Sequence, residues 1–492
     1  MWGYALTATR RWVRLVAGSV LLGAALVVPA AGAAPGASVS CGSGQAGLAA
    51  AINAANGGGG GTITLASGCT YTLTSPDNGE NGLPVITTRI AVNGNGATID
   101  GSNALRIFEV DGPSGKLSAQ QLTLTRGSAG DFGGAVLNAG GTVTLTNTVV
   151  TDNAATIAGG GIASGTFGPN TGATLTLNNS SVTGNNSPGT GNFDGAGGGI
   201  VNNQGVVTLN RSAVTDNDAG GQGGGIATGN LTGGPGPLAS LTLNKSQVNG
   251  NSAPNSGGGG IQNLAGVVTL NSSEVNGNTA LNGGGISSGN GQGGAPPNPA
   301  QLVLNKSQVN GNTSTAPPPA GQGQGPPIAG GGIANGGNAV LNMTQVDGNN
   351  STTSGAGIVN HGSMTLNHSE VNGNTAAGHG GVASGGGIIN VDLSAQTGAV
   401  GSGVLTINHS QIEDNRAGGF GGGIANGLPL PQQPMPGGAL TLNHSQVTAN
   451  AAALGGGGIF NINAPVTLSH SSVTGNNPDN CEPTGSISGC TS

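Results

Sequence analysis

Apolar and polar residues alternate in short stretches that recur along this chain of 492 residues. Leu175-Thr176-Leu177 and Leu241-Thr242-Leu243 are two such stretches, each flanked by turn-forming residues. Alternation over a few residues between turns predicts a β-strand with one buried face, whereas a helix would show a period near 3.6. The chain is therefore expected to consist mainly of short strands.

The strands belong to a longer unit, GGGI followed by a loop and LTLNxSxVxGN, which recurs eleven times from about Gly133 to Asn476. Successive units close at asparagines that lie 25 to 41 residues apart. A unit that recurs while its spacing varies is typical of a solenoid, in which each repeat forms one coil and carries loops of different length. The closing asparagines are Asn153, Asn185, Asn217, Asn251, Asn278, Asn312, Asn349, Asn374, Asn415, Asn450 and Asn476.

Aligned repeats place similar residues in columns. The leucine column should face inward, because strand side chains alternate between the two faces. An asparagine follows this leucine in nine of eleven coils, from Asn178 to Asn443. We expect that asparagine to adopt the left-handed conformation that turns one strand into the next, and stacked asparagines to hydrogen-bond between coils. A third strand should include the GGGI segment, such as Gly197–Ile200, so that three strands form each coil.

Stacked coils of this kind predict an all-β protein, a parallel β-helix of about 11 to 13 coils. Residues 35–132 should form an N-terminal cap and the first degenerate coils, residues 133–476 the repeated coils, and residues 477–492 a C-terminal tail. Within the cap, Ala46–Asn56 reads as a short amphipathic helix that would cover the open end of the first coil.

The first 34 residues have the features of an export signal. Arg10, Arg11 and Arg14 precede an apolar run, Leu15–Val28, and small residues follow it. The arginine pair fits a twin-arginine signal as well as an ordinary one, so the export route stays open. We expect a secreted protein, extracellular or associated with the cell envelope, without a membrane span after signal cleavage.

Four cysteines lie outside the repeats, in two pairs that are close in sequence. Export to an oxidising compartment favours two local disulfides, Cys41 with Cys69 and Cys481 with Cys490, one at each end of the solenoid. Zinc binding is less favoured, because neither pair has CxxC spacing or a nearby histidine.

Composition excludes some functions. The 102 glycines and 25 prolines would indicate low complexity if they had no period, but here they recur with the repeat. Charged residues make up 6% of the chain and the net charge is −7, which disfavours nucleic-acid binding. Aromatic residues make up 2%, so the stacking platform of an ordinary sugar-binding module is not expected.

Two groups of β-helix proteins share motifs with these residues. The segment from Leu48 to Asn56, with Thr62–Leu65 and Thr98–Gly101, resembles the start of secreted bacterial proteins named for the CSLREA motif, although Ala49 and Ala50 stand where that motif has Arg-Glu. The coils resemble the GGAI and FxxN repeats of chlamydial-type polymorphic outer-membrane proteins, with Val or Ile in place of Phe. These resemblances, with the usual chirality of parallel crossovers, imply a right-handed helix and an adhesin-like surface role.

Parallel β-helices also resemble pectate lyases and polygalacturonases, which implies an enzymatic alternative. A lyase of that type would need carboxylates around calcium with a basic residue nearby, and a hydrolase would need paired acids. Asp194, Asp216, Asp218 and Arg211 form the densest charged group and are the catalytic candidates. Solvated turn acids beside the asparagine columns are the competing and favoured interpretation of this group.

Histidines form a second candidate. They occupy one outward position in four consecutive coils, where earlier coils carry Asn, Arg, Lys, Ser and Met. Stacked imidazoles could bind a transition metal or become charged together at acidic pH, although a variable polar surface column explains them as well. These histidines are His368, His409, His444 and His470.

Two His-Gly pairs, His361-Gly362 and His379-Gly380, are similar to the His-Gly element of polygalacturonases. The Asp pair and the Arg-x-Lys element that accompany it in that family are absent, so no hydrolase site is assigned here. Four long insertions, Gly289–Ala300, Ser314–Ala329, Val391–Gly403 and Leu428–Gly438, recur at fixed coil positions and would carry a recognition surface.

Taken together, the sequence predicts a secreted structural or adhesin-like binding module that is not an enzyme. A polysaccharide lyase or glycoside hydrolase of the pectin-lyase type is the alternative. No cofactor is expected, apart from calcium if the chain is a lyase. The expected partner is a cell-surface glycan or protein, and the oligomeric state stays open.

Overall fold

A computed structural model describes residues 36–165, 172–190, 194–231, 236–289, 299–316, 328–378, 383–393, 403–430 and 434–490. The predicted export signal lies outside these residues, as do residues 290–298, 317–327, 394–402 and 431–433 of the four predicted insertions. In the described part of the chain, none of the helices has the length and apolar character needed to span a membrane.

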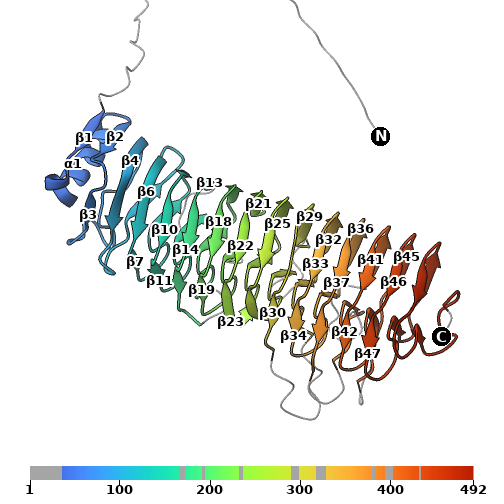
Figure 1. Cartoon of the computed structure of the whole chain (residues 1–492). Helices are drawn as coiled ribbons and strands as arrows, with labels where there is room; N and C mark the ends of the chain where they lie inside the picture. Colours follow the sequence, from blue (N-terminus) through green and yellow to red (C-terminus); the bar gives the residue numbers. More distant parts are fainter. Residues whose placement is uncertain are drawn as a thin grey trace, which may run out of the picture. The chain divides into compact units, whose positions relative to one another are not determined.

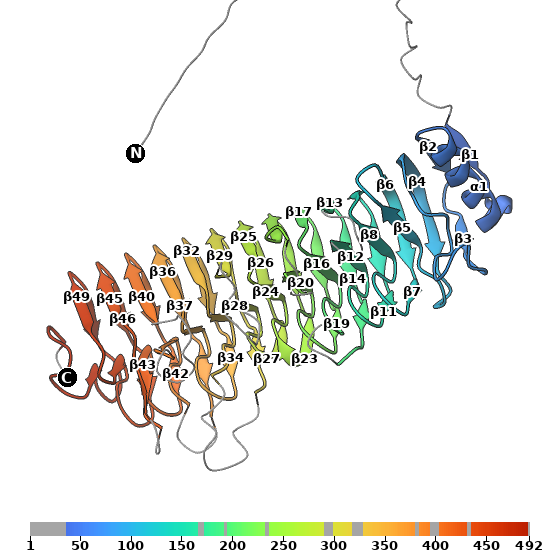
Figure 2. The ribbon, with the colours of Figure 1, turned by 180° about the vertical axis from the view of Figure 1, so that it is seen from behind.

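The described chain is a right-handed parallel β-helix. The repeat predicted the parallel coils, and the family resemblance with the usual chirality of parallel crossovers predicted the hand. Successive coils lie side by side in sequence order from the cap to the C-terminal tail (Figures 1 and 2). Each residue of a strand pairs with the equivalent residue of the next coil, for example Ile200 with Ile226, Leu209 with Leu243 and Val214 with Val248. The repeat therefore sets the register directly.

Most coils contain four strands, and not the three predicted from the sequence. The first strand begins at the isoleucine that follows the glycines. In chain order these strands are β5 (Phe108–Asp111), β8 (Val136–Ala139), β12 (Ile162–Gly165), β16 (Ile200–Asn203), β20 (Ile226–Gly229), β24 (Ile261–Leu264), β28 (Ile286–Gly289), β31 (Ile333–Asn335), β35 (Ile358–Asn360), β39 (Ile388–Asn390), β43 (Ile424–Leu428), β48 (Ile459–Asn461) and β51 (Cys481–Glu482), with β44 (Met435–Pro436) antiparallel to β43.

The second strand carries the LTLN segment. This ladder is the longest and starts in the cap. It comprises β1 (Ala37–Val39), β2 (Gly61–Leu65), β4 (Arg89–Asp100), β6 (Lys116–Thr125), β9 (Thr142–Thr146), β13 (Thr174–Asn178), β17 (Val206–Asn210), β21 (Ser240–Asn244), β25 (Val267–Asn271), β29 (Gln301–Asn305), β32 (Asn338–Asn342), β36 (Ser363–Asn367), β40 (Val404–Asn408), β45 (Leu440–Asn443) and β49 (Val466–Ser469).

The third strand surrounds the valine of VxGN. It comprises β3 (Thr70–Thr72), the ends of β4 and β6, β10 (Val149–Thr151), β14 (Ser181–Thr183), β18 (Ala213–Thr215), β22 (Gln247–Asn249), β26 (Glu274–Asn276), β33 (Gln345–Asp347), β37 (Glu370–Asn372), β41 (Gln411–Glu413), β46 (Gln446–Thr448) and β50 (Ser472–Thr474). Between β26 and β33 the coil at Gln308 pairs through single bridges.

The fourth strand follows the closing asparagine and is mostly two residues long. It comprises β7 (Ser128–Ala129), β11 (Ala154–Ala155), β15 (Asn186–Ser187), β19 (Asp218–Ala219), β23 (Ser252–Gly257), β27 (Thr279–Asn282), β30 (Thr313–Ser314), β34 (Asn350–Ser351), β38 (Thr375–Ala376), β42 (Arg416–Ala417) and β47 (Ala451–Ala452). The glycines of GGGI lie between this strand and the next one. The predicted single strand across this segment is therefore divided in two.

The core is a continuous apolar column inside the coils. Ile200, Leu209 and Val214 of one coil are fully buried, and equivalent residues repeat this arrangement along the solenoid. Low hydrophobicity per coil is tolerated because each apolar side chain is covered by its equivalents in the two neighbouring coils.

Buried asparagines provide a second stacking interaction. The amide Nδ2 of Asn312 donates to Oδ1 of Asn349 at 3.0 Å, and its own Oδ1 accepts from Asn278 Nδ2 at 2.9 Å. The same bond joins each closing asparagine to the next from Asn153 to Asn476. An outer ladder at the first asparagine column is likewise bonded from Asn178 to Asn443, which confirms the predicted contact between coils.

The left-handed turn between the second and third strands was assigned to the wrong residue. The asparagine of the outer ladder remains in its strand, and the residue after it has a positive φ, such as 46° at Asn179 and 50° at His409. The chain must turn before the following serine, because that serine points into the core. The asparagine amide is hydrogen-bonded to its equivalents in the neighbouring coils, which keeps the asparagine in the strand. The bend therefore falls on the next position.

Both ends of the described solenoid are closed as predicted. Helix α1 (Gly44–Gly57), preceded by the 3-10 turn Cys41–Ser43, buries Leu48 and Ile52 against the first strands. A disulfide joins Cys41 to Cys69. At the other end Cys481 is bonded to Cys490, and β51 pairs with β48.

Candidate functional site

A line of exposed residues follows the bend between the second and third strands. We call it the turn ladder. Its members all have φ between 46° and 51°, and every side chain is exposed. They are Asn147, Asn179, Arg211, Lys245, Ser272, Lys306, Met343, His368, His409, His444 and His470.

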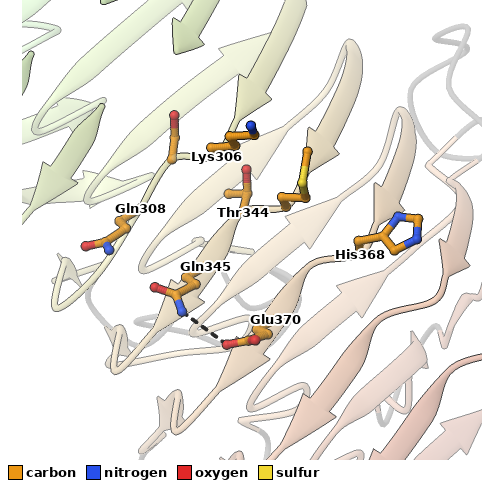
Figure 3. A pocket seen from close by; sticks show the side chains of 8 residues that line it. Lys306, Gln308, Thr344, Gln345, His368 and Glu370 are labelled. Carbon is orange, nitrogen blue, oxygen red and sulfur yellow. Dashed lines mark hydrogen bonds between the residues drawn. The ribbon is translucent and has the colours of Figure 1, made fainter. Parts of the chain in front are cut away.

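Beside the turn ladder lies a shallow pocket of about 240 Å³, which we call the polar groove (Figure 3). Three successive coils contribute to it. The turn ladder gives one side, the third strands give the other, and buried hydroxyl residues lie between them. Its lining residues are Lys306, Ser307, Gln308, Met343, Thr344, Gln345, His368 and Glu370.

Hydrogen-bonding groups predominate in the polar groove. Gln345 donates from Nε2 to Oε2 of Glu370 at 3.2 Å, a bond that links adjacent coils (Figure 3). The hydroxyl groups of Ser307 and Thr344 bond to backbone carbonyls of their own coil, which fixes both side chains. The ammonium group of Lys306 adds a cation, so the groove offers an ammonium group on one side and amide and carboxylate groups on the other.

A perturbed carboxyl group lies next to the groove on β33. Burial raises the pKa of Asp347 to about 6, and the nearby charge of Glu370 also raises it, against the opposing effect of a hydrogen bond from the Asn372 backbone. That bond joins the Asn372 nitrogen to Asp347 Oδ1 at 3.1 Å. Neighbouring coils carry asparagine at this position, for example Asn310 and Asn372.

Asp347→Asn should raise the stability of the protein at pH 8 and lose about half of that advantage at pH 5. Because the folded pKa of Asp347 lies above its unfolded value, the folded state binds more protons between about pH 4 and 6, and stability falls as pH rises through this window. The amide removes the ionisation and can accept the same bond from Asn372. Urea denaturation of both proteins at the two pH values measures the effect. An equal midpoint shift at pH 5 and pH 8 would contradict it.

The predicted catalytic group is spread over different parts of the coils. Asp216 lies in the turn before Asn217, and Asp218 lies in β19. Asp194 precedes the GGGI segment that begins at Gly197. All three side chains are exposed. Arg211 donates from Nε to Asn179 Oδ1 at 2.9 Å, a bond along the turn ladder. Among the described residues no ion pair joins Arg211 to these acids.

The aspartate column has a conformational explanation. Asp152, Asp216 and Asp414 have φ of 56°, 55° and 54°, at the position where most coils have glycine. Aspartate tolerates the left-handed region better than most residues, which accounts for its recurrence at this turn. Across the described ranges, no group of three or more His, Cys, Asp or Glu is arranged to hold a metal ion.

The four candidate histidines stack on the turn ladder. Ring centroids of successive histidines from His368 to His470 lie 4.9, 4.9 and 4.8 Å apart, with interplanar angles of 8°, 1° and 7°. Regular spacing follows from the coil repeat, because each ring projects from an equivalent left-handed residue.

His361 has a different environment. Burial lowers its pKa, and a Cβ at Gly336 would lie 2.4 Å from its Cε1 atom. The ring therefore packs closely against the coil before and does not line the polar groove. The second His-Gly pair, at His379, lies outside the described residues.

Comparisons with known proteins add limited information. No protein-family model matches the chain, and no curated protein matches it. Among solved structures, the A-module of Azotobacter vinelandii mannuronan C-5 epimerase AlgE6 is similar at 13% identity and a TM-score of 0.46, over 87% of this chain and 94% of that one. The AlgE4 A-module of the same organism is similar at 14% identity and a TM-score of 0.41, over 88% of this chain and 96% of that one. Pectate lyase Pel9A is similar at 14% identity and a TM-score of 0.28, over 90% of this chain and 80% of that one.

These likenesses say nothing about activity at such scores. The resemblance to the CSLREA-type and polymorphic outer-membrane families stays a prediction, as does the adhesin-like role. The functional interpretation therefore rests on this chain's own side chains.

Sequence reasoning missed two polar features. One is a third asparagine column, in which Asn335 Nδ2 donates to Asn360 Oδ1 at 2.9 Å and Asn360 donates in turn to Asn390 at 2.8 Å. The signal was present as an asparagine two residues after the isoleucine of GGGI. The other is Arg106 in the cap, 3% exposed and paired with Glu109 and Asp131.

Proposed function

We propose that this chain is an extracellular, non-enzymatic binding module whose polar groove holds an extended glycan. The observation that carries the proposal is the groove lining. Gln308, Gln345 and Glu370 present donors and acceptors from three successive coils in one column along the solenoid, and Lys306 lies on the other side of the groove. A linear polymer with repeated hydroxyl groups can meet such a line with one contact after another, so modest individual bonds add up along its length.

Location outside the cytoplasm is part of the proposal. Two disulfides lie near the ends of the described chain, and disulfides persist in oxidising compartments. The arginines and the apolar run near the start of the sequence support export, because this order of charged and apolar residues is typical of an export signal. Cell-surface or matrix glycans are the partners that such a location makes available.

A panel of immobilised plant, fungal and bacterial polysaccharides tests the groove. The purified protein should be retained on at least one of them and release no soluble products. Gln345→Ala should weaken retention several-fold because the variant loses a groove amide and its bond to Glu370. Gln446→Ala is the matched control, since Gln446 has the equivalent position on β46 outside the groove.

Equal weakening by both substitutions would place binding elsewhere on the solenoid. Absence of retention on every polysaccharide would reject the glycan and leave a structural or protein-binding role. Both results are readable without knowing the ligand in advance.

A polysaccharide-cleaving enzyme is the second candidate, and one observation favours it. Asp347 has a raised pKa and lies near Glu370, and glycoside hydrolysis uses a carboxylic acid of raised pKa together with a second carboxyl group. The same polysaccharide panel, with and without calcium, distinguishes this candidate by product release. Glu370→Gln is the variant to test, because Gln345 and Gln411 occupy the equivalent position in the neighbouring coils. Loss of the products in this variant would establish the enzyme.

A further inference from the structure

The C-terminal part of the turn ladder concentrates metal-ligating side chains on an exposed surface. Four imidazoles and one thioether follow one another in five successive coils, from Met343 through His368 to His470. Met343 is 52% exposed, an unusual state for an apolar residue in a left-handed turn. Imidazole nitrogen is a ligand for copper and other transition metals.

We propose that the stacked imidazoles form a binding site for Cu²⁺, with two rings of successive coils holding each ion. Imidazole lone pairs lie in the ring plane, so an ion cannot sit between two parallel rings. It must lie at their outer edges, where the ring nitrogens face solvent. Exposed side chains can turn to that geometry without disturbing the core.

Ring spacing decides which histidines can cooperate. Two nitrogens bound at about 2 Å from one ion are at most about 4 Å apart. Neighbouring rings have centroids 4.9 Å apart and reach this separation by tilting their outer edges together. Rings that are two coils apart have twice the spacing and cannot share an ion, so adjacency is required.

Copper is favoured over the other divalent ions. Affinity for nitrogen sites generally rises through the first transition row to Cu²⁺ and falls at Zn²⁺. Tetragonal Cu²⁺ is satisfied by two imidazoles with water in the remaining positions, and this matches a surface ladder that supplies two rings from one side. Glu370 lines the polar groove together with His368 and makes the surface there more favourable to a cation.

Two double variants with the same number of histidines test the site. His409→Asn/His444→Asn leaves His368 and His470, which are three coils apart. His368→Asn/His470→Asn leaves His409 and His444, which are adjacent. Asparagine is chosen because Asn147 and Asn179 occupy the same left-handed position in earlier coils, so both variants should fold.

Untagged mature protein is titrated with CuCl₂ in a calorimeter, and the complexes are examined by electron paramagnetic resonance. The parent protein should bind two Cu²⁺ ions on the ladder with imidazole nitrogen couplings. The variant that keeps the adjacent pair should bind one, and the variant that keeps the separated pair should bind none there. Equal copper binding by the two double variants, or spectra without imidazole coupling, would overturn the proposal. Glycan retention is measured in parallel, and its failure would leave the copper result unaffected.

Discussion

Asn312→Ala is expected to lower the free energy of unfolding by about 4 kcal/mol, because it leaves two buried N–H bonds of Asn278, one from the backbone and one from Nδ2, without an acceptor. The Oδ1 atom of Asn312 accepts from both the backbone nitrogen and Nδ2 of Asn278, each at 2.9 Å. Asn312 is fully buried, so water cannot replace it. A buried unsatisfied donor costs about 1–3 kcal/mol, and alanine also leaves a cavity.

Asn305→Ala is the control in the same coil. Asn305 donates to Asn271 Oδ1 at 3.0 Å and accepts from Asn342 at 2.9 Å, but its side chain is only half-buried on the outer ladder. Water can satisfy the freed groups, so a loss below about 1 kcal/mol is expected. Urea denaturation, with hydrogen exchange to locate the weakened coils, measures both. Similar losses would show that the inner ladder is no more important than the outer one.

Gly223→Ala should destabilise the protein by about 3 kcal/mol or more, through conformation and contact together. Gly223 is the first glycine of its GGGI segment, with φ of 68°. A Cβ there would lie 2.5 Å from the Ile226 carbonyl oxygen and 2.8 Å from the Ala227 nitrogen. Both are backbone atoms of the following strand, which pairs with the next coil, so neither can move away at low cost.

Gly277→Ala separates the two effects. Its φ is 64°, but a Cβ there would meet no atom within 4 Å, and Ala449 already occupies the equivalent turn with φ of 56°. The left-handed conformation alone should cost about 1–2 kcal/mol. Thermal and urea denaturation measure the loss of stability in each variant. The difference between the two losses is the cost of the close contact at Gly223. Equal destabilisation would mean that the GGGI backbone can open to admit a side chain.

Much of the architecture was predictable because the coil repeat is visible as columns. Inward leucines and isoleucines follow from alternation, and the asparagine ladder follows from one amide per coil. The capping helix and both disulfides were also predicted and are confirmed. The fourth strand was missed because two residues, such as Asn186–Ser187, are too short to show a period.

The turn was misplaced for a chemical reason. Left-handed conformations are normally indicated by Gly, Asn or Asp, and here the residues at the bend include Arg211, Lys306, Met343 and His409. Ladder hydrogen bonds keep Asn178 and its equivalents in the strand, and this tertiary constraint overrides local preference. No single-repeat pattern contains that information.

The polar groove was missed because its parts are far apart in sequence. Lys306 and Glu370 belong to different coils, and only the register of stacked strands brings both to the same pocket. Proximity in sequence suggested the acids from Asp194 to Asp218 instead, but residues of one coil that lie on different strands face different directions. In a solenoid the relevant neighbours are one repeat away.

The equivalence of pairing along the solenoid has a consequence for its dimensions. Ile226 pairs with Ile200 on one side and with Ile261 on the other, so removing a whole coil would join two edges that already match. Each coil adds about 4.8 Å, the spacing between hydrogen-bonded strands. Gain or loss of single repeats can therefore change the length of the solenoid in fixed steps, while the residues on its side surfaces stay the same.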